Sequence, residues 1–484
     1  MLLLAGVFLA KSTLIINATV IDGTGSKPKS ASVRLLDGKI NAVGNLKPIE
    51  GETVVDAKGL VVAPGFIDAH SHALGGIADE PTSLSQLTQG ITTAVVGQDG
   101  GWSKPVAEEM ADLDGIKPSL NFAFFSGHGG LRRRVMGEDY KRVANPMEQG
   151  IMRSLLADDM HAGALGLSSG LEYDPGYYSD TAELVSLARV AGEAGGIYIS
   201  HIRDEADKSF EAFAEVAQIR DQANVRTQIS HIKLGTQKVW GRARDVDAFL
   251  NQEGVTADVY PYLYWHSTIA ALSPSRDWAN AAIWVQGLAD VGGPQNVRLV
   301  GYTHEPTWVG KNLAEISALT GKSAPALIQE ILEKTEGPTG SGSQHVVVTA
   351  MTEPDLEHFI QHPKIMFCSD GAIGGRHPRG AGSFPRILGR YVRERKTISL
   401  SEAIRKMTSL PARTFLLKRR GELKPGFAAD VVLFDPNTIN DRATPENPTE
   451  LSVGVNSVWV NGERVLADGK STGTRSGVVI RRAN

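Results

Sequence analysis

The chain has 484 residues, of which 42% are hydrophobic and 21% charged, so it exceeds one small domain and has room for a barrel of about 250 residues with accessory parts. Its formal net charge of -4 gives no electrostatic basis for binding nucleic acid or an anionic membrane, so we expect a small molecule as its partner. Cys368 is its one cysteine, which excludes an internal disulfide and a cysteine-based zinc cluster, so any metal must be held by His and carboxylate side chains.

Residues 1–12 read MLLLAGVFLAKS, an apolar run that is too short to span a bilayer but comparable to the core of a signal peptide. The run lacks the positive residues that usually precede such a core. An export signal and an irregular extension both fit this segment. The localisation is therefore open between cytoplasmic and exported, and no transmembrane segment is expected.

Short alternating segments separated by Gly and Asp turns begin at residue 13, and the same style returns near the end of the chain. This alternation is typical of antiparallel β-structure. We predict one discontinuous β-sandwich, built from residues 13–62 and 419–484.

Between these ends, apolar β-branched runs alternate with helical patterns, as in a parallel sheet wrapped by helices. Eight candidate strands can be counted, at 60–72, 91–100, 119–129, 163–173, 196–205, 225–234, 255–264 and 364–371. Eight βα units predict an α/β fold of the TIM-barrel type, (β/α)8, for residues 63–418. A doubly wound open sheet is the alternative, but no Gly-rich phosphate loop follows the first strand. The long gap between strands seven and eight predicts an inserted subdomain at 275–350 over the barrel mouth.

Metal-type side chains stand at the ends of several of these strands. His70 and His72 close strand one, and His201, His231 and Asp370 close strands five, six and eight. Catalytic groups of a TIM barrel come from these carboxyl ends. Because His70 and His72 are two residues apart on a strand, both imidazoles point to the same side and can reach one ion. The pair alone is a weak signal, but the recurrence of His at corresponding ends, with a terminal Asp, predicts a metal site.

The motifs at these ends, GFIDAHSH, the two SH pairs and SDG, resemble those of the amidohydrolase superfamily. Longer motifs, among them GALGLSSGLEYDPG, YISHIRDE, QISHIKLG and RGELKPGFAADVVLFDP, are similar to those of the N-acyl-D-amino-acid deacylases, or D-aminoacylases. The resemblance covers nearly the whole chain. It implies a metal-dependent hydrolase on a TIM barrel flanked by a β-sandwich, with one or two Zn²⁺ ions as cofactor and an N-acyl-D-amino acid as substrate.

One departure from the family concerns the turn after strand two. The best-known D-aminoacylases place a metal-binding cysteine there in a GNCG-like turn, whereas this chain reads GQDG, with Asp99 at the place of the cysteine. Glu172, at the end of strand four, is expected to bridge or supplement the histidine ligands, with Asp99 as the alternative. Whether one ion or two bind stays open for the same reason.

The expected chemistry is hydrolysis of a linear amide. A Zn²⁺ ion lowers the pKa of its bound water to about 7 and polarises the scissile carbonyl. Hydroxide then attacks, and Asp370 shuttles the proton to the departing amine; the resemblance implies that Asp370 also touches the metal. The alternatives are a dipeptidase for D- or isoaspartyl-type peptides, a cyclic amidase of the dihydroorotase and hydantoinase kind, and a non-catalytic scaffold. Cyclic amidases usually carry a carboxylatable lysine on strand four, and that run has none here.

The carboxylate of such a substrate favours planar, bidentate recognition by arginine. The resemblance assigns this role to Arg379 in HPRG, with Tyr173 and Lys233 lining the same pocket. Ser267, after strand seven, is a further candidate contact. His128, at the end of strand three, is expected either to steady the oxyanion or to order a neighbouring arginine.

Overall fold

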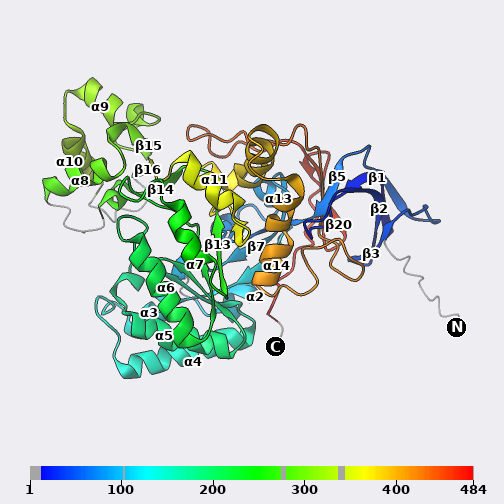
Figure 1. Cartoon of the computed structure of the whole chain (residues 1–484), viewed down its shortest axis with the longest axis horizontal. Coiled ribbons are helices and arrows are strands. Elements are labelled where there is room, and N and C mark those ends of the chain that lie inside the picture. The colour runs from blue at the N-terminus through cyan, green and yellow to red at the C-terminus, as the bar shows by residue number, and fades with distance from the viewer. Residues whose placement is uncertain (1–11, 102–103, 274–279, 336–343, 483–484) are drawn as a thin grey trace.

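The computed structural model describes residues 12–101, 104–273, 280–335 and 344–482. Residues 1–11, which belong to the segment expected to be an export signal or an extension, lie outside the described residues. In Figure 1 a sheet formed by the chain ends lies on the right, the parallel strands with their helices lie in the middle, and the segment from residue 264 to residue 349 lies at the upper left. Within the described residues, no helix is both long enough and apolar enough to cross a membrane.

Both chain ends contribute to a single nine-stranded sheet. Its strands are β1 (Ser12–Val20), β2 (Lys29–Leu36), β3 (Lys39–Gly44), β4 (Thr53–Asp56), β5 (Val61–Pro64), β18 (Val431–Phe434), β19 (Val455–Val460), β20 (Glu463–Ala467) and β21 (Lys470–Ser471). The two ends meet where β5 pairs antiparallel with β18, with Pro64 opposite Val431. One buried core contains side chains from both chain ends, among them Ile15, Val33 and Trp459. The nine-stranded sheet therefore encloses a core of its own.

The parallel strands form two sheets in which all pairs are parallel. One contains β6 (Phe66–Asp68), β7 (Ile91–Val96) and β8 (Asn121–Phe124), and the other contains β9 (Ser126–Gly127), β10 (Gly166–Gly170), β11 (Ile197–His201), β12 (Arg226–Ile229), β13 (Val255–Val259) and β17 (Ile365–Phe367). Nearly every residue in these strands is buried, as in strands covered on both faces. Backbone hydrogen bonds also join the two sheets, from Leu165 N to Phe124 O at 2.7 Å and from Asp370 N to His70 O at 2.8 Å.

Helices follow most of these strands and lie around them (Figure 1). They are α1 (Leu84–Leu87), α2 (Val106–Ile116), α3 (His128–Met136), α4 (Pro146–Ala162), α5 (Thr181–Glu193), α6 (Ser209–Ala223), α7 (Asp247–Leu250), α11 (Glu353–Gln361), α12 (Arg379–Arg386), the π-helix η8 (Ile387–Glu394), α13 (Leu400–Met407) and α14 (Ser409–Thr414). The helix α5 begins at the N-cap Asp180, whose side chain accepts a hydrogen bond from Glu183 N at 2.8 Å. Its buried face, which includes Leu184 and Leu187, belongs to the largest core, which it shares with the parallel strands.

The segment from β14 to β16 has a sheet and a core of its own, and its described residues form three α-helices. Its antiparallel strands are β14 (Tyr264–Ser267), β15 (Val297–Tyr302) and β16 (Gln344–Thr349), with β16 in the middle, and its helices are α8 (Ala281–Asp290), α9 (Leu313–Thr320) and α10 (Ala324–Lys334). Parts of the predicted 275–350 subdomain, at 275–279 and 336–343, lie outside the described residues. The sequence pattern assigns Tyr264 to strand seven, but β13 ends at Val259 because Pro261 lacks the N–H that continues a ladder. The strand β14 pairs instead with β16.

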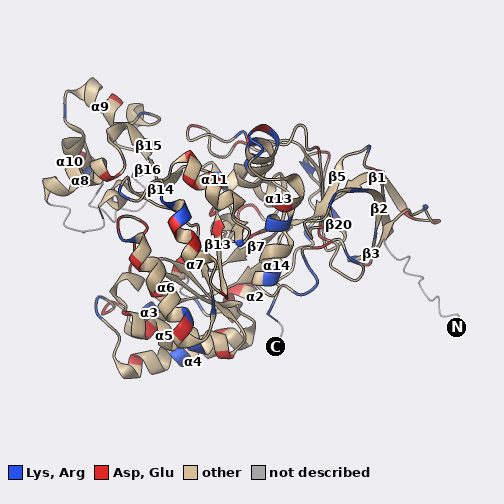
Figure 2. Cartoon of the chain, viewed as in Figure 1, with Lys and Arg blue, Asp and Glu red and all other residues tan. Residues whose placement is uncertain are grey.

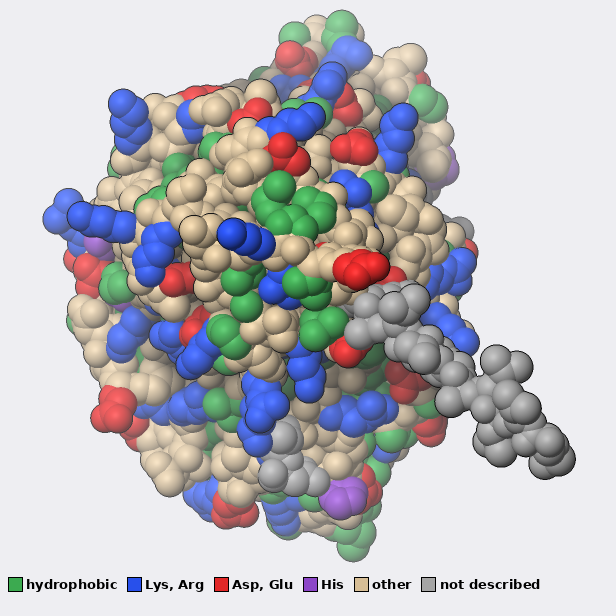
Figure 3. All heavy atoms as spheres, turned by 90° about the vertical axis from the view of Figure 1, so that its right-hand side faces the viewer, with side chains coloured by type: hydrophobic (Ala, Val, Ile, Leu, Met, Phe, Trp, Pro, Cys, Tyr) green, Lys and Arg blue, Asp and Glu red, His purple; other side chains and the backbone are tan. Residues whose placement is uncertain are grey.

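Charged residues of both signs are interspersed over all parts of the chain (Figure 2). Figure 3 views the molecule from the side of the nine-stranded sheet, where hydrophobic side chains gather near the centre and Lys and Arg side chains surround them. The net charge of -4 is thus a mixture of signs rather than an acidic part and a basic part.

Candidate metal centre and active site

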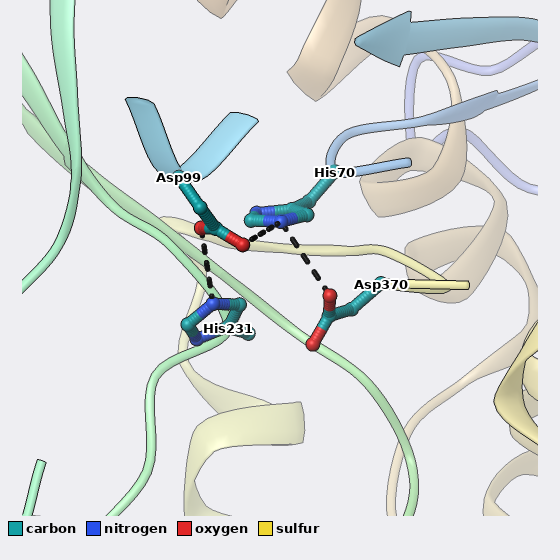
Figure 4. Close-up of side chains that lie close together, drawn as sticks. All are labelled: His70, Asp99, His231 and Asp370. Atoms are coloured by element: carbon teal, nitrogen blue, oxygen red, sulfur yellow. Dashed lines mark ion pairs between the residues drawn. The ribbon is translucent and has the colours of Figure 1, made fainter. Parts of the chain in front are cut away.

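Four polar side chains converge at the carboxyl ends of the parallel strands. His70 follows β6, Asp99 follows β7, His231 follows β12 and Asp370 follows β17. Ligand-type atoms of all four lie within 4.8 Å of one another. In Figure 4 the side chains point toward one another: His70 Nε2 lies 3.5 Å from Asp99 Oδ2 and 3.5 Å from Asp370 Oδ1, and His231 Nε2 lies 3.4 Å from Asp99 Oδ1. Residues far apart in the sequence meet here because parallel strands end at a common edge.

Three of these four residues have a left-handed backbone conformation, which is uncommon outside glycine. The φ angle is 57° at Asp99, 32° at His231 and 48° at Asp370. At Asp99 the turn also requires Gly97, because a Cβ on Gly97 would lie 2.3 Å from the carbonyl oxygen of Phe125. Backbone strain of this kind concentrates at functional sites, where the surrounding structure holds it in place.

A second group of ligand-type residues adjoins the first and shares His231. It consists of His201, Glu205 and His231. The Nδ1 atom of His201 lies 3.1 Å from His231 Nε2, and Glu205 Oε1 lies 3.0 Å from His231 Nδ1. The Nζ atom of Lys233 donates to both oxygens of Glu205, at 2.6 and 2.7 Å. The two groups form one continuous cluster of imidazoles and carboxylates.

His72 joins the first group from the more open side. Its Nε2 atom lies 3.1 Å from Asp370 Oδ1 and 3.3 Å from Asp99 Oδ2. Burial alone would lower the pKa of the His72 imidazole, but hydrogen bonds with Asp370 and Asp99 raise the pKa to about 9. A proton and a metal ion therefore compete for the same nitrogen.

The two carboxylates of the first group stay ionised for the same electrostatic reason. Burial alone would raise the pKa of each, but His70 and the neighbouring imidazoles hold the pKa of Asp99 well below its usual range. Arg379, followed by His231, does the same for the pKa of Asp370. The Arg379 Nη1 atom lies 2.6 Å from Asp370 Oδ2, so one oxygen of Asp370 is held by arginine while the other faces the histidines.

Asp68, the last residue of β6, forms hydrogen bonds with the residue that follows β17 by two positions, next to the site. Its Oδ1 accepts from Ser369 N at 2.7 Å and its Oδ2 from Ser369 Oγ at 2.5 Å. Burial raises the pKa of the Asp68 carboxyl to about 7, although these hydrogen bonds oppose the shift. His70 and Asp370 each lie within two residues of this contact, so the hydrogen bonds between Asp68 and Ser369 fix their relative position.

The hydrogen bonding of the cluster fits a bound metal ion. Among the described residues, neither ring nitrogen of His70 has a hydrogen-bond partner, and neither does Asp99 Oδ1, although all three atoms are buried. Buried polar atoms are paired in the great majority of native structures, so these atoms require a partner of another kind. Imidazole nitrogens and carboxylate oxygens are ordinary ligands of Zn²⁺.

Asp99 and Glu172, the two carboxylates considered for the place of the family's cysteine, differ in position. Carboxylate oxygens of Asp99 lie within 3.3 to 3.9 Å of all four predicted histidine ligands, His70, His72, His201 and His231. Glu172 Oε2 lies 3.2 Å from the Nε2 atom of His201, and Glu172 Oε1 accepts from Glu205 N at 2.7 Å. Asp99 is therefore central to the cluster, and Glu172 lies at its edge.

The predicted substrate contacts do not all lie in one place. The ring of Tyr173 lies 4.5 Å from that of His201, and this tyrosine is 46% exposed, so it lines the opening of the site. Lys233 and Arg379 reach the cluster through the ion pairs given above. Ser267 lies on β14, opposite Val346 of β16, and so belongs to the inserted sheet.

His128 lies in a buried ion network behind the site. Its Nε2 atom is 2.7 Å from Glu183 Oε1, and Arg132 Nη1 donates to both oxygens of Glu183 at 2.6 Å. Of the two roles expected for His128, this geometry matches the ordering of the arginine, since both side chains share Glu183.

Three residues of the site were missed by sequence reasoning. Glu205 stands four residues after His201 within the motif YISHIRDE, so a ligand-type residue near a ligand was the available signal. The ring of Tyr260 lies 4.9 Å from the Arg379 guanidinium carbon, and His377 Nδ1 accepts from Arg379 N at 2.9 Å. Both position Arg379, and nothing local in the sequence marks them for that role.

Comparison with known proteins gives consistent full-length matches. The chain matches the amidohydrolase family over residues 53–261 and 289–466. It is 32% identical to a D-aminoacylase of Alcaligenes xylosoxydans xylosoxydans, with 97% of each chain covered. It is 35% identical to an N-acyl-D-glutamate deacylase of the same organism, with 96% of this chain and 95% of that relative covered.

A solved structure extends the likeness to three dimensions. The crystal structure of an N-acyl-D-glutamate deacylase from Bordetella bronchiseptica, complexed with zinc and a phosphonate mimic of the tetrahedral intermediate, matches with a TM-score of 0.84 at 35% identity. The match covers 97% of this chain and 99% of that one. The chain therefore belongs to the amidohydrolase family, together with D-aminoacylase and N-acyl-D-glutamate deacylase.

Proposed function

We propose that the protein is a metal-dependent N-acyl-D-amino-acid deacylase, which hydrolyses the amide bond of its substrate to a carboxylate and a free D-amino acid. The observation that carries the proposal is the convergence of His70, Asp99, His231 and Asp370 within 4.8 Å. The full-length relatives named above are deacylases of this kind, which supports the reaction and its D-stereochemistry.

Zn²⁺ is the ion that we propose for this centre. Its ligands are drawn from His70, His72, His201, His231 and Asp99, with Asp370 beside them and Glu172 at the edge. The zinc in the Bordetella relative and the mixture of imidazole and carboxylate donors both support zinc. The ion would polarise the amide carbonyl and make a water molecule acidic enough to ionise near neutral pH. Glu205, with His201 and His231, offers donors for a second ion.

Asp370 is the residue that moves the proton. Because Arg379 holds Oδ2, the free oxygen Oδ1 is the one that faces the histidines. In its ionised form, Oδ1 takes a proton from water as the water oxygen bonds to the acyl carbon. The same oxygen then gives that proton to the amide nitrogen as the C–N bond breaks, which leaves a carboxylate and an amine.

The substrate's α-carboxylate is bound by the cations at the edge of the cluster. Lys233 is buried and Arg379 is partly buried, and each already faces one carboxylate, so their positions are fixed before substrate arrives. Tyr173 lines the opening beside His201. Ser267 is directly opposite Val346, a core residue of the inserted segment, so its side chain lies on the core-facing side of that sheet and is not among the proposed contacts.

We infer in addition that the parallel strands close into an eight-stranded barrel, in which β8 and β9, separated only by Phe125, count as one strand. The bonds from Leu165 N to Phe124 O and from Asp370 N to His70 O support this, since they link the two parallel sheets on both sides. The barrel occupies residues 63–418, the segment 275–350 lies over its mouth, and residues 13–62 with 419–484 form the flanking β-domain.

The direct test is an assay of the purified protein with N-acetyl-D-methionine and N-acetyl-L-methionine, with and without added Zn²⁺. We expect release of methionine from the D-compound, stimulated by Zn²⁺ and abolished by a chelator. Matched D- and L-substrates are the control for stereochemistry, since they differ in nothing else. Hydrolysis of the L-compound alone contradicts the D-specific assignment, and protein that binds no transition metal contradicts the metal centre.

A further inference from the structure

The turn that carries Asp99, residues 97–100, lies close against the neighbouring strand β10. A Cβ on Gly170, the last residue of β10, would lie 2.2 Å from the Asp99 carbonyl oxygen, so the strand has no space for a side chain there. Asp99 is one of three residues of this turn with a positive φ, the others being Gly97 at 83° and Gly100 at 67°. A backbone of this kind persists only where the surrounding structure determines it.

One hydroxyl joins the two ends of this turn. Ser168 of β10 is fully buried, and its Oγ atom donates to the Gly97 carbonyl oxygen at 2.5 Å. The same atom accepts from Gly100 N at 3.2 Å. Because the two hydrogen bonds reach the backbone on both sides of Asp99, they set the direction in which the Asp99 carboxylate leaves the turn.

A side-chain amide joins the same turn to the chain beside His70. Gln98 is buried, and its Nε2 atom donates to the Ala69 carbonyl oxygen at 3.1 Å. Gln98 precedes Asp99, and Ala69 precedes His70. This hydrogen bond therefore fixes the distance between the two members of the cluster, whose Oδ2 and Nε2 atoms lie 3.5 Å apart (Figure 4).

The next serine along β10 faces the opposite side of the strand. Ser168 is opposite Ile199 of β11, which packs in a different core from the one that the strands share with the helices. Ser169 is opposite Ser200, donates to its Oγ at 3.0 Å, and lies 2.6 Å from the hydroxyl of Tyr198, which packs in the core shared with the helices. Successive side chains on a strand alternate in this way. Two adjacent buried serines thus differ in the face that they occupy, and Ser168 is the one bonded to the turn.

We propose that Ser168 and Gln98 are positioning residues of the metal centre, which hold Asp99 where its carboxylate can bind the ion together with the histidines. The proposal rests on the metal-dependent function proposed above. Without these hydrogen bonds the turn is free to relax from its left-handed conformation, and the carboxylate then loses its alignment with the imidazoles. Loss of an outer-shell partner commonly lowers metal affinity by about 10- to 100-fold.

The test measures zinc affinity by competition with a chromophoric chelator in the wild type, Ser168→Ala and Gln98→Met. The first substitution removes only the hydroxyl, and the second keeps the length of the side chain without its amide. We expect each to weaken zinc binding about 10- to 100-fold. The control is Ser169→Ala, which removes an equally buried hydroxyl from the same strand. It should change zinc affinity by less than about twofold, because it removes no contact with a ligand-bearing segment.

Two further measurements separate positioning from a general loss of stability. Ser168→Ala and Ser169→Ala should lower the melting temperature by similar amounts, since each loses the hydrogen bonds of one buried hydroxyl. Of the two, Ser168→Ala alone should alter the visible absorption spectrum of the cobalt-loaded protein, because that spectrum reports the geometry of the ligands around the metal. In an Asp99→Ala background, adding Ser168→Ala should change zinc affinity by less than about twofold, since the residue through which it acts is absent.

The outcomes separate this proposal from the function on which it rests. A wild type that binds no zinc overturns the metal centre itself. Zinc affinity in Ser168→Ala and Gln98→Met equal to that of a zinc-binding wild type overturns the positioning role alone. Equal losses in Ser168→Ala and Ser169→Ala overturn it as well. If Ser168→Ala does not fold, as judged by circular dichroism, Gln98→Met with and without Asp99→Ala decides in its place.

Discussion

At the carboxyl ends of the parallel strands, His70 and Asp99 keep buried polar atoms for which the described residues supply no hydrogen-bond partner. At the amino ends, Asn121 and Lys406 are bound by partners from distant parts of the chain. Asn121, the first residue of β8, donates to Asp430 Oδ2 at 3.2 Å and accepts from Asn461 Nδ2 at 2.7 Å. Lys406, below β17, donates to the carbonyl oxygens of Ile360 and His362.

The difference shows how one set of strands serves two purposes. Groups left without protein partners at the carboxyl end remain available to an ion and a substrate. Groups paired at the amino end contribute to stability, which matches the general division of labour between the two ends of TIM-barrel strands. Substitutions at the carboxyl end should therefore change catalysis with little effect on folding, and substitutions at the amino end should do the reverse.

The largest effect is expected for Asp370→Asn at the carboxyl end. An amide of the same shape cannot take the proton from water, so kcat on N-acyl-D-amino acids should fall about 10²- to 10⁴-fold. The melting temperature should move by less than about 5 °C, since shape and packing are kept. Asp112→Asn, which alters an exposed carboxylate paired with Lys104, is the matched control. Near-normal turnover of Asp370→Asn would remove this residue from the proton pathway.

The next effect concerns zinc affinity and separates Asp99 from Glu172. Asp99→Ala should weaken zinc binding by at least about 100-fold, because even the loss of an outer-shell contact commonly costs 10- to 100-fold. Asp99→Cys should retain zinc, since a thiolate is a strong zinc ligand. Glu172→Ala should have the smaller effect because Glu172 contacts one imidazole at the edge. Competition with a chromophoric chelator measures all three, and a larger loss in Glu172→Ala than in Asp99→Ala contradicts the central place given to Asp99.

At the amino end, Asn121→Ala should lower stability and leave catalysis intact. The substitution removes the bonds to Asp430 and Asn461 and leaves Val478 N without its acceptor. The free energy of unfolding in urea should fall by about 2–3 kcal/mol, while kcat/KM stays within about twofold. Asn251→Ala on the exposed surface is the control and should change stability by less than about 0.5 kcal/mol. A catalytic defect in folded Asn121→Ala would break the division between the two ends.

The smallest effect is a pH dependence at Lys406. Burial lowers the pKa of the Lys406 ammonium to about 7, whereas an unfolded lysine titrates near 10.4. Between these values the unfolded chain binds more protons than the folded one, so this lysine makes stability rise as the pH rises from about 7 to 10. Below about pH 7 both forms are protonated and the contribution is constant.

Lys406→Met should therefore lose stability relative to the wild type by about 1–3 kcal/mol at pH 9, where the neutral amine still donates to two carbonyl oxygens. The deficit should shrink as the pH falls toward 7, because only the wild type then carries a buried charge. Urea unfolding at pH 7, 8 and 9 measures it, and Lys334→Met, a half-exposed lysine paired with Glu330, is the control. A deficit that is the same at all three pH values would contradict the lowered pKa.

Most residues of the cluster could be predicted from the sequence, because the end of a strand can be recognised from the residues immediately around it. Alternation assigned His70 and His72 to one side of strand one, whereas β6 ends at Asp68 and both histidines follow the strand. The end-of-strand rule selected His231 and Asp370. The structure brings all of these together. Which carboxylate replaces the cysteine could not be read locally, since it depends on how strands two and four are spaced around the site.

The inserted segment was less predictable for a related reason. Its helices α9 and α10 are consistent with local periodicity, because apolar residues recur at helical spacing along LAEISALT and APALIQEILEK. Its strands β15 and β16 do not stand out, because β-pairing joins segments that are separated in the sequence. The stacking of the His266 ring on that of His345 depends on the pairing of β14 with β16, so it could not be predicted before the strands were placed.

The pairing of β5 with β18 also has a consequence for biosynthesis. The strand β5 leads into β6 and His70, and Gly65 N donates to Asp430 O at 2.8 Å, so the support of the first ligand comes from near the end of the chain. Asp370 and its contact with Asp68 are likewise translated late. A nascent chain that emerges from the ribosome N-terminus first therefore lacks the partners that fix His70. We expect zinc to be captured after chain release, and premature termination before residue 430 to yield chains that retain no zinc.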